Sequence, residues 1–202
     1  MDDKFESILN QVAERGWSVT PDFLPADMLN ALIEEEHALW EEGLFRQAGI
    51  GAGAATMVRP EIRSDRILWL DPDNLTPHVA AYWQVIDALR IRLNREFFLG
   101  LRDFEAHFAV YPPGSFYKRH LDRHQHVRQR TISCILYLNR DWTDDAGGHL
   151  RIYEGSGEQE SYLDVLPQFG TFVCFRSDSV YHVVLPATRE RFSLTGWLRT
   201  PA

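Results

Sequence analysis

The stretch Arg191-Phe192-Ser193-Leu194-Thr195-Gly196-Trp197-Leu198 alternates between two kinds of side chain. Every second residue is apolar or glycine, whereas Arg191, Ser193 and Thr195 stand between them. Because successive side chains of a β-strand point to opposite faces, the stretch predicts a strand with one polar face. That face either lies in water at a sheet edge or lines a cavity built to hold an anion, and the alternation leaves both readings open.

The same period of two runs through the second half of the chain. Candidate strands cover 104–111, 117–122, 131–139, 149–153, 161–165, 171–175, 180–185 and 191–198. Turn-forming residues such as Pro112-Pro113-Gly114 and Gly147-Gly148 separate them. Short strands at regular spacing after a helical region favour an antiparallel β-sandwich or jelly roll with helices packed outside.

The first hundred residues have mainly helical periodicity. Apolar residues recur at helical spacing from Phe5 to Val12, and Gly16 is the expected C-cap. A second helix is expected to start near Pro25 and to bury Leu29, Leu32, Ile33 and Trp40. A third is expected to begin with Thr76 as N-cap and Pro77 at its first position.

Two segments between these helices have other patterns. Residues 17–20 predict a short strand, and residues 43–62, which are rich in glycine and alanine, predict a mobile loop. We therefore expect one domain over 1–202, with helical support and the loop in 1–100 and a β core in 103–199.

Length, charge and cysteine content limit the class of protein. The 202 residues are 45% hydrophobic and carry a formal net charge of -8, which repels a phosphate backbone and disfavours nucleic acid as a partner. We expect no membrane partner and a cytoplasmic location, because the N-terminus has no secretory signal pattern and no apolar run approaches ~18 residues. Cys134 and Cys174 form no CxxC pair and are expected to be buried residues in a reducing compartment.

A histidine and an aspartate stand two residues apart in Tyr117-Lys118-Arg119-His120-Leu121-Asp122. On a strand, His120 and Asp122 would face the same way and could bind one metal ion. His182, in the apolar run 180–185, is the candidate third ligand, although a lone histidine there is more often a core residue. His124 and His126 lie in a stretch typical of a solvated loop, which argues against a local three-histidine zinc site.

These residues and their neighbours resemble the non-haem iron(II) and 2-oxoglutarate-dependent dioxygenases, most closely the prolyl hydroxylases related to the hypoxia-inducible-factor enzymes. The resemblance covers about residues 40–199. It rests first on His120-x-Asp122, the distal His182 and Arg191. Further matching segments are Tyr111-Pro112, Cys134 to Trp142, Gly147 to Tyr153, Arg191 to Trp197, and Arg63 to Trp69.

The resemblance implies a double-stranded β-helix (jelly roll) core and a set of site residues. Fe(II) would be held by His120, Asp122 and His182, which leaves coordination sites open for 2-oxoglutarate and O2 as cosubstrates. The distal carboxylate of 2-oxoglutarate would be bound by Arg191, Tyr137 and Thr195, with Tyr111 nearby. Arginine suits this role because its planar, permanently charged fork can pair with a carboxylate inside an apolar barrel. No residue is expected to act as a nucleophile.

The resemblance also implies a reaction and a substrate. The expected reaction is 4-hydroxylation of a prolyl residue in a protein, with release of succinate and CO2 and with ascorbate as the reductant. Bacterial relatives act on translation elongation factor Tu, so elongation factor Tu is the leading candidate target. Residues 48–60 would form a lid, Asp65 would pair with Arg130 at the substrate entrance, and Tyr117 and Trp197 would lie on the substrate side.

Three other functions compete with this one. A nucleic-acid demethylase would carry a second arginine where this chain has Trp197. A hydroxylase of a free amino acid or small metabolite would use the same ligands. A non-catalytic, cupin-like sensing module would keep the barrel without turnover. There is no GxSxG elbow for a hydrolase and no glycine-rich nucleotide motif in a strand-to-helix context.

Overall fold

Two antiparallel β-sheets make up most of the molecule. The computed structural model describes residues 1–50, 57–123, 128–155 and 160–201. The larger sheet has the strand order β1-β9-β6-β11-β4-β3-β2, and the smaller has the order β5-β10-β7-β8. The strands are β1 (Trp17–Thr20), β2 (Arg46–Gln47), β3 (Arg66–Trp69), β4 (Asp103–Tyr111), β5 (Tyr117–His120), β6 (Arg130–Tyr137), β7 (Leu150–Glu154), β8 (Ser161–Val165), β9 (Phe172–Arg176), β10 (His182–Val184) and β11 (Arg191–Arg199).

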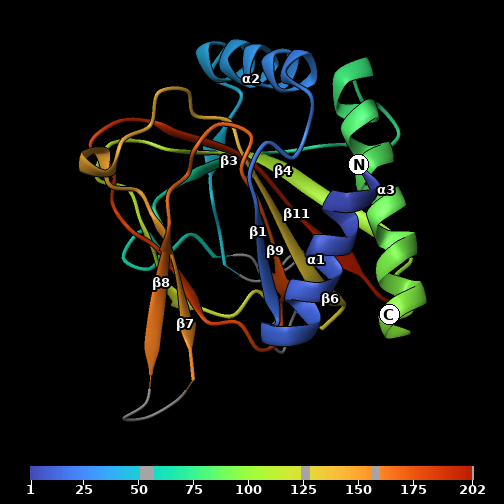
Figure 1. The fold of residues 1–202 in the computed structure, drawn as a ribbon. Helices are drawn as coiled ribbons and strands as arrows, with labels where there is room; N and C mark the ends of the chain where they lie inside the picture. The colour runs from blue at the N-terminus through green and yellow to red at the C-terminus, as the bar shows by residue number, and fades with distance from the viewer. Residues whose placement is uncertain (51–56, 124–127, 156–159, 202) are drawn as a thin grey trace.

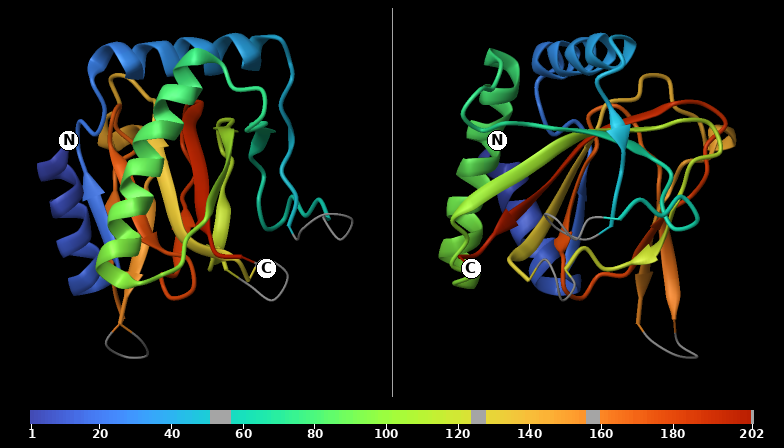
Figure 2. Two further views of the ribbon diagram at one scale, coloured as in Figure 1. Left: turned by 90° about the vertical axis from the view of Figure 1, so that its right-hand side faces the viewer. Right: turned by 180° about the vertical axis from the view of Figure 1, so that it is seen from behind.

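Three α-helices lie outside the sheets. Helices α1 (Asp2–Arg15) and α3 (Pro77–Phe97) run along one face of the larger sheet, and α2 (Ala26–Glu41) crosses its end (Figures 1 and 2). A 3-10 turn, η2 (Asp144–Ala146), precedes β7. The predicted class, mainly β with a jelly-roll core and N-terminal helices packed outside, is confirmed. Among the described residues, no helix has both the length and the apolar character needed to cross a bilayer.

The helix ends follow the local sequence. The hydroxyl oxygen of Thr76 accepts a hydrogen bond of 3.4 Å from the Val79 amide, which satisfies one free N–H of the first turn of α3. Gly16 ends α1 with a φ of 83°, a conformation that costs glycine little. One expectation about α2 was wrong, because Trp40 is only half-buried. Its indole N–H donates to the Glu190 carboxylate at 3.1 Å.

Strand β11 contributes one face to the core beneath the helices and the other face to the space between the two sheets. It is a central strand, paired with β4 on one side and β6 on the other, which excludes the reading of a solvated edge. Phe192, Leu194 and Leu198 pack in the core between the sheet and the helices. Gly196 lies on the same face, where a Cβ atom would stand 2.5 Å from the Phe104 ring. The alternate residues of β11 therefore face the space between the two sheets.

The first hundred residues contribute more to the sheet than their pattern predicts. Strand β1 matches the expected strand at 17–20, but β2 and β3 were not predicted, and β2 lies inside the segment 43–62 that was expected to be a loop. Strand β3 adds to the edge of β4 from Arg66↔Val110 to Trp69↔His107. Residues 51–56, the middle of the expected lid, lie outside the described residues.

Candidate active site

Three predicted metal ligands meet in the smaller sheet. His182, the first residue of β10, is the antiparallel partner of His120, the last residue of β5. Potential ligand atoms of His120, Asp122 and His182 all lie within 4.8 Å of one another. The Asp122 Oδ1 atom is 3.3 Å from His120 Nε2 and 3.7 Å from His182 Nε2. Strand β5 ends at His120, so Asp122 reaches the cluster from the following turn and not from the strand that was predicted to carry it.

The backbone fixes which nitrogen of each imidazole is available. His120 Nδ1 is 2.7 Å from the Lys118 carbonyl, and His182 Nδ1 is 3.1 Å from the Val180 carbonyl. Since a carbonyl oxygen only accepts, each Nδ1 carries the proton and donates it. Each Nε2 atom therefore has a free lone pair, which is the state in which histidine binds a metal.

The carboxylate of Asp122 is held in its charged form. Burial by itself would raise the pKa of Asp122, but His182, His120 and the Ser133 hydroxyl together lower it below the ordinary value. Burial also lowers the pKa of His182 to about 4, with His120 adding to the effect. The cluster therefore offers a carboxylate oxygen and two imidazole Nε2 atoms, a donor set that fits Fe(II).

Arg191 lies on the facing sheet and carries a buried positive charge. It is 2% exposed, and its Nε donates to the Gly148 carbonyl at 2.9 Å. Its guanidinium carbon lies 5.1 Å and 4.8 Å from the ring centres of Tyr111 and Tyr137. Within the described residues no carboxylate lies within ion-pairing distance of it. A buried charge without a counter-ion is costly, so this end of the pocket is suited to an anionic ligand.

Polar groups around Arg191 point to the same kind of ligand. The Tyr137 hydroxyl is buried without a well-formed hydrogen bond to a described residue. Burial raises the pKa of this phenol, which therefore stays a hydrogen-bond donor, and Arg191 offsets part of the rise. Ser193 and Thr195 follow Arg191 along the inner face of β11, with their hydroxyl oxygens 3.4 Å apart. The predicted Arg191, Tyr111 and Tyr137 thus lie together, and Thr195 lies further along the inner face of β11 beside Ser193.

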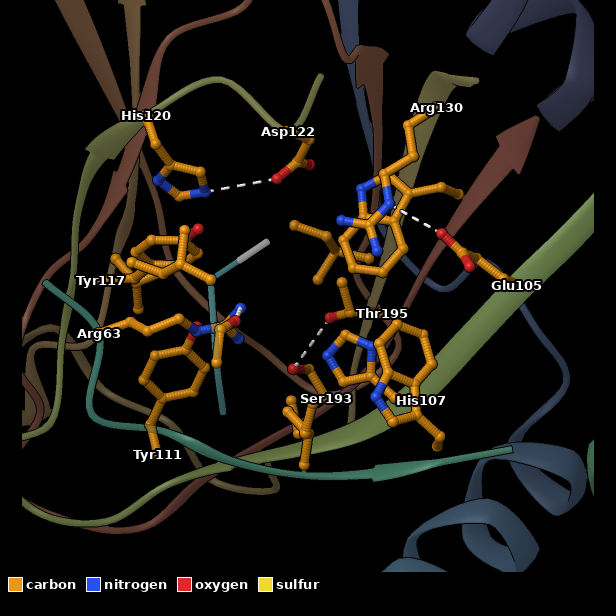
Figure 3. Close-up of a pocket in the computed structure, with 18 of the residues that line it drawn as sticks. Arg63, Glu105, His107, Tyr111, Tyr117, His120, Asp122, Arg130, Ser193 and Thr195 are labelled. Atoms are coloured by element: carbon orange, nitrogen blue, oxygen red, sulfur yellow. Dashed lines mark hydrogen bonds and ion pairs between the residues drawn. The ribbon is translucent and has the colours of Figure 1, made fainter. Parts of the chain in front are cut away.

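A single cavity of about 980 Å³ joins the metal cluster to Arg191. Figure 3 shows His120 and Asp122 on one side of it and Thr195, Ser193 and His107 on the other. Tyr111, Tyr117, Arg130 and Trp197 also line it, whereas Tyr137 is packed in the core between the sheets beside Arg191. The volume lies at the upper end of the range for small-molecule pockets.

The predicted ion pair between Asp65 and Arg130 is wrong. Asp65, which is fully buried, accepts two hydrogen bonds from Arg63, at 2.8 Å to Nε and 2.5 Å to Nη2. Arg130 instead donates to Glu105 at 2.8 Å, and its guanidinium lies 3.4 Å from the centre of the Trp197 ring. The strand register explains this contact. Glu105 on β4 is the partner of Trp197 on β11, and Arg130 lies on β6 at the other side of β11, so its side chain crosses the Trp197 indole to reach Glu105.

Arg63 connects this ion pair to a metal ligand. Its guanidinium lies 4.5 Å from the centre of the Tyr117 ring, which in turn stacks on His120 at 3.5 Å with an angle of 16° between the planes. The backbone supports this stack, since Ser64 N–H donates to the Phe116 carbonyl and Lys118 N–H donates to the Ile62 carbonyl. Residues 62–64 therefore lie along β5, the strand that ends in His120.

His107 is a pocket residue that sequence reasoning did not place. Its ring packs against those of Trp69 and Trp197, at centroid distances of 4.8 Å and 5.4 Å, and the two indoles are themselves 6.1 Å apart. Burial lowers the pKa of His107 well below its ordinary value, with Arg63 and Arg130 adding to the effect, so the ring is neutral. The signal was its position four residues before Tyr111 on one strand, which places both side chains on the inner face.

Comparison with known proteins gives consistent matches. A family model described as the 2OG-Fe(II) oxygenase superfamily matches residues 106–199. The chain is 31% identical over 208 residues to the hypoxia-inducible factor prolyl hydroxylase of Caenorhabditis elegans, covering 95% of this chain and 28% of that protein. It is 29% identical over 201 residues to human Egl nine homolog 1, covering 95% and 46%. The chain therefore spans less than half the length of these two relatives.

Solved structures match over nearly the whole chain. A prolyl-4-hydroxylase of Pseudomonas putida has a TM-score of 0.87 and 41% identity, covering 98% of this chain and 100% of that one. A prolyl hydroxylase of Trichoplax adhaerens, in complex with a peptide fragment of the hypoxia inducible factor oxygen degradation domain, has a TM-score of 0.84 and 25% identity, covering 96% and 88%.

Proposed function

Since the chain belongs to the prolyl hydroxylases of the 2-oxoglutarate- and iron(II)-dependent oxygenase superfamily, we propose that it hydroxylates a prolyl residue of a protein substrate. One observation carries the proposal. A His–Asp–His cluster with two available Nε2 atoms shares a pocket with a buried arginine that pairs with no carboxylate of the described residues. A metal and a dianionic cosubstrate would satisfy both features at once.

The metal would be held by His120, Asp122 and His182. Three protein ligands leave coordination positions free for other groups, unlike a closed structural site. With Fe(II), 2-oxoglutarate and O2 bound, this centre supplies the oxidation of an unactivated C–H bond, and the co-products are succinate and CO2. The protein's part is to orient the groups and to keep water out.

The cosubstrate would lie between the two sheets. Arg191 would pair with its distal carboxylate, and the Tyr137 and Thr195 hydroxyls would donate to the same group. The carboxylate would neutralise the buried guanidinium charge. The guanidinium has already been removed from water in the free protein, so the ion pair would contribute strongly to the affinity for the cosubstrate. The inward face of Tyr111 would close this end of the pocket.

The prolyl substrate would enter at the other end of the pocket, past Trp69 and Trp197. Aromatic rings with N–H donors suit an X–Pro segment, because the amide before proline offers only an acceptor. Trp197 Nε1 has no hydrogen-bond partner among the described residues, but it is buried, so neighbouring side chains would have to move before it could donate to such an acceptor. Arg63, which lines the pocket and is held by the buried Asp65, would shape this entrance together with the expected lid at 48–60. Intact turnover by Asp65→Ala at unchanged substrate affinity would count against that role.

The identity of the substrate is proposed from the resemblance to bacterial prolyl hydroxylases, with elongation factor Tu as the candidate. The test is to incubate the protein with Fe(II), 2-oxoglutarate, ascorbate and purified elongation factor Tu in air. Succinate release and a mass increase of one oxygen on a single proline are expected. The Asp122→Ala variant, which lacks the anionic ligand, should give neither product.

Other outcomes would point elsewhere. Modification of different proteins in a cell extract would retain the reaction and reject the named target. Hydroxylation of free proline or another small metabolite, with no protein modified, would favour a small-molecule hydroxylase. Absence of both succinate formation and 2-oxoglutarate binding would favour a non-catalytic sensing module.

A further inference from the structure

Two buried serine hydroxyls stand behind the Asp122 carboxylate. The Ser133 hydroxyl donates to Asp122 Oδ2 at 2.5 Å, and the hydroxyl oxygens of Ser133 and Ser177 are 2.8 Å apart. Ser133 and Ser177 are both fully buried. Neither was predicted as a site residue, and neither hydroxyl points to a described group other than these two contacts.

The direction of this short relay follows from proton counting. An ionised carboxylate can only accept, so Ser133 must donate its single proton to Asp122. Ser177 then has to donate to Ser133, because Ser133 has no second proton. The relay therefore runs from Ser177 through Ser133 to Asp122, and each hydroxyl is fixed in one orientation.

The relay ties together the chain segments that carry the ligands. Ser133 lies on β6 in the larger sheet, and Ser177 lies in the turn between β9 and β10, the strand that begins with His182. The Ser177 amide donates to the Thr131 carbonyl at 3.0 Å, and the Ser177 carbonyl accepts from the Arg123 amide at 2.9 Å. Arg123 directly follows Asp122, so the turn before His182 and the turn after β5 are joined at Ser177.

We propose that Ser133 and Ser177 are positioning residues that reserve one oxygen of Asp122 for the metal and fix its direction. A free carboxylate can rotate, or can bind a metal through both oxygens. With Oδ2 engaged by Ser133, only Oδ1 is left facing the two Nε2 atoms, at 3.3 Å and 3.7 Å. The carboxylate then acts as a one-oxygen ligand and leaves the remaining positions of the metal free. The inference rests on the proposed function, since it concerns the same metal.

The test measures metal binding without turnover, with Co(II) as the probe. Co(II) is titrated under nitrogen into the wild-type protein and its variants, and its visible absorption reports both affinity and coordination geometry. Loss of a group that orients a ligand typically weakens metal affinity by about 10–100-fold. We expect a loss of this size and an altered spectrum for Ser133→Ala. A smaller loss is expected for Ser177→Ala, because its effect passes through Ser133.

Two further variants separate positioning from packing. Ser133→Thr keeps the hydroxyl and should retain most of the Co(II) affinity. Ser18→Ala is the matched control, because Ser18 is also a fully buried serine of the larger sheet, and its hydroxyl donates to the Cys174 carbonyl at 3.4 Å. It should lose some stability and bind Co(II) as the wild type does.

Each result decides between the two proposals. Wild-type Co(II) affinity and spectrum in a folded Ser133→Ala would overturn the positioning role and leave the proposed function intact. Where Ser133→Ala does not fold, an unchanged spectrum and affinity in Ser177→Ala would overturn it. Failure of the wild-type protein itself to bind Co(II) would reject the metal site, and with it the proposed function and this inference.

Discussion

At the scale of single residues, the role proposed for Arg191 gives ligand binding priority over the stability of the free protein. Its charge is buried, and among the described residues it has carbonyl and aromatic neighbours but no ion-pair partner. The free energy of burying the guanidinium is therefore not recovered until an anion binds. Replacing Arg191 by an uncharged residue should therefore leave the free protein as stable or more stable, but should make the protein with ligand less stable than the wild type.

Arg191→Met tests this directly. Without ligand, the melting temperature should equal or exceed that of the wild type, because an uncompensated buried charge has been removed. Addition of Mn(II) and 2-oxoglutarate should stabilise the wild type but hardly affect the variant, with affinity for 2-oxoglutarate reduced by at least about tenfold, or ~1.4 kcal/mol. Thermal melts with and without ligand measure both effects. An unchanged ligand-induced shift would contradict the role of Arg191.

Glu36 is a second buried charged residue, on the helix side of the larger sheet. Burial raises the pKa of Glu36 well above its ordinary value, an effect only partly opposed by the amides of Ser193 and Ala109 and by Arg191. Its carboxyl oxygens have no well-formed hydrogen bond to a described residue. The folded state therefore keeps a proton on Glu36 at pH values where the unfolded chain has lost it.

The sign of the pH dependence follows from this difference. Above the unfolded pKa of 4.5 the native state binds more protons, so Glu36 makes the protein less stable as the pH rises. Glu36→Gln should be about as stable as the wild type near pH 4 and more stable at pH 7, by up to about 1.4 kcal/mol for each unit by which the pKa of Glu36 is raised. Urea unfolding at both pH values measures the difference. A stability difference that does not change with pH would contradict the prediction.

Much of the site was predictable at this scale, and the failures have a common cause. The cluster of His120, Asp122 and His182 could be named because His120 and Asp122 stand two residues apart and His182 interrupts an apolar run. The partner of Asp65 could not be named, because the sequence alone does not show that Arg130 is already engaged by Glu105 and Trp197. His107 was missed because the apolar residues around it on β4 did not settle which face of the strand points inward, although Glu105 and Tyr111 lie on the same face.

At the scale of elements, the segment 62–65 is the connection that matters most for the site. It hydrogen-bonds along β5 and places Arg63 on Tyr117, which stacks on His120. The Arg63–Asp65 pair that anchors it is almost completely buried. Removing one partner of a buried ion pair leaves the other charge without compensation, which costs about 3–5 kcal/mol.

Asp65→Asn should therefore destabilise the protein by about 3 kcal/mol and loosen the segment from β5. Faster hydrogen exchange of the Ser64 and Lys118 amides and a lower urea midpoint are the expected results. Glu61→Gln is the matched control, since Glu61 pairs with Arg59 at the surface and its loss should leave both measurements unchanged. Equal exchange rates in Asp65→Asn and wild type would show that the pair does not hold the segment.

Element boundaries were predictable where periodicity was long. Strand β11 was predicted almost residue for residue, because eight alternating positions leave little ambiguity. Strands β2 and β3 were not predicted. They have only two and four residues, and none of these residues is fully buried, so no alternation of buried and exposed side chains marks them. The shorter β5 has a local cause, because the chain turns after His120 to bring Asp122 back toward β10.

At the scale of the whole molecule, the site exists only between the two sheets. The metal ligands belong to the smaller sheet and its turns, whereas Arg191, Thr195 and Ser133 belong to the larger sheet. A ligand that touches both should therefore stabilise the packing of one sheet on the other. Fold class was predictable from strand spacing, but which strands share a sheet depends on long-range pairings that no local pattern contains.

Binding of metal and 2-oxoglutarate together should raise the melting temperature more than either alone. At a ligand concentration one hundred times its dissociation constant, the gain is about 2.7 kcal/mol. Mn(II) and 2-oxoglutarate are suitable probes in thermal melts, and a chelator should reverse the gain. A larger effect on the amide protection of β5 and β10 than on α1 would place the stabilisation at the inter-sheet site.

The pairing of His182 with His120 also bears on how the protein is made. His120 and Asp122 are synthesised close together, but β6, β7, β8 and β9 are all made before His182 appears. The third ligand then takes its place only when β10 inserts between β5 and β7. A growing chain thus offers at most two of the three proposed ligands, and the proposed metal centre is first complete when the last strand of the smaller sheet is inserted. The order of synthesis therefore delays assembly of this centre until every strand of the smaller sheet has been made, with only β11 still to follow.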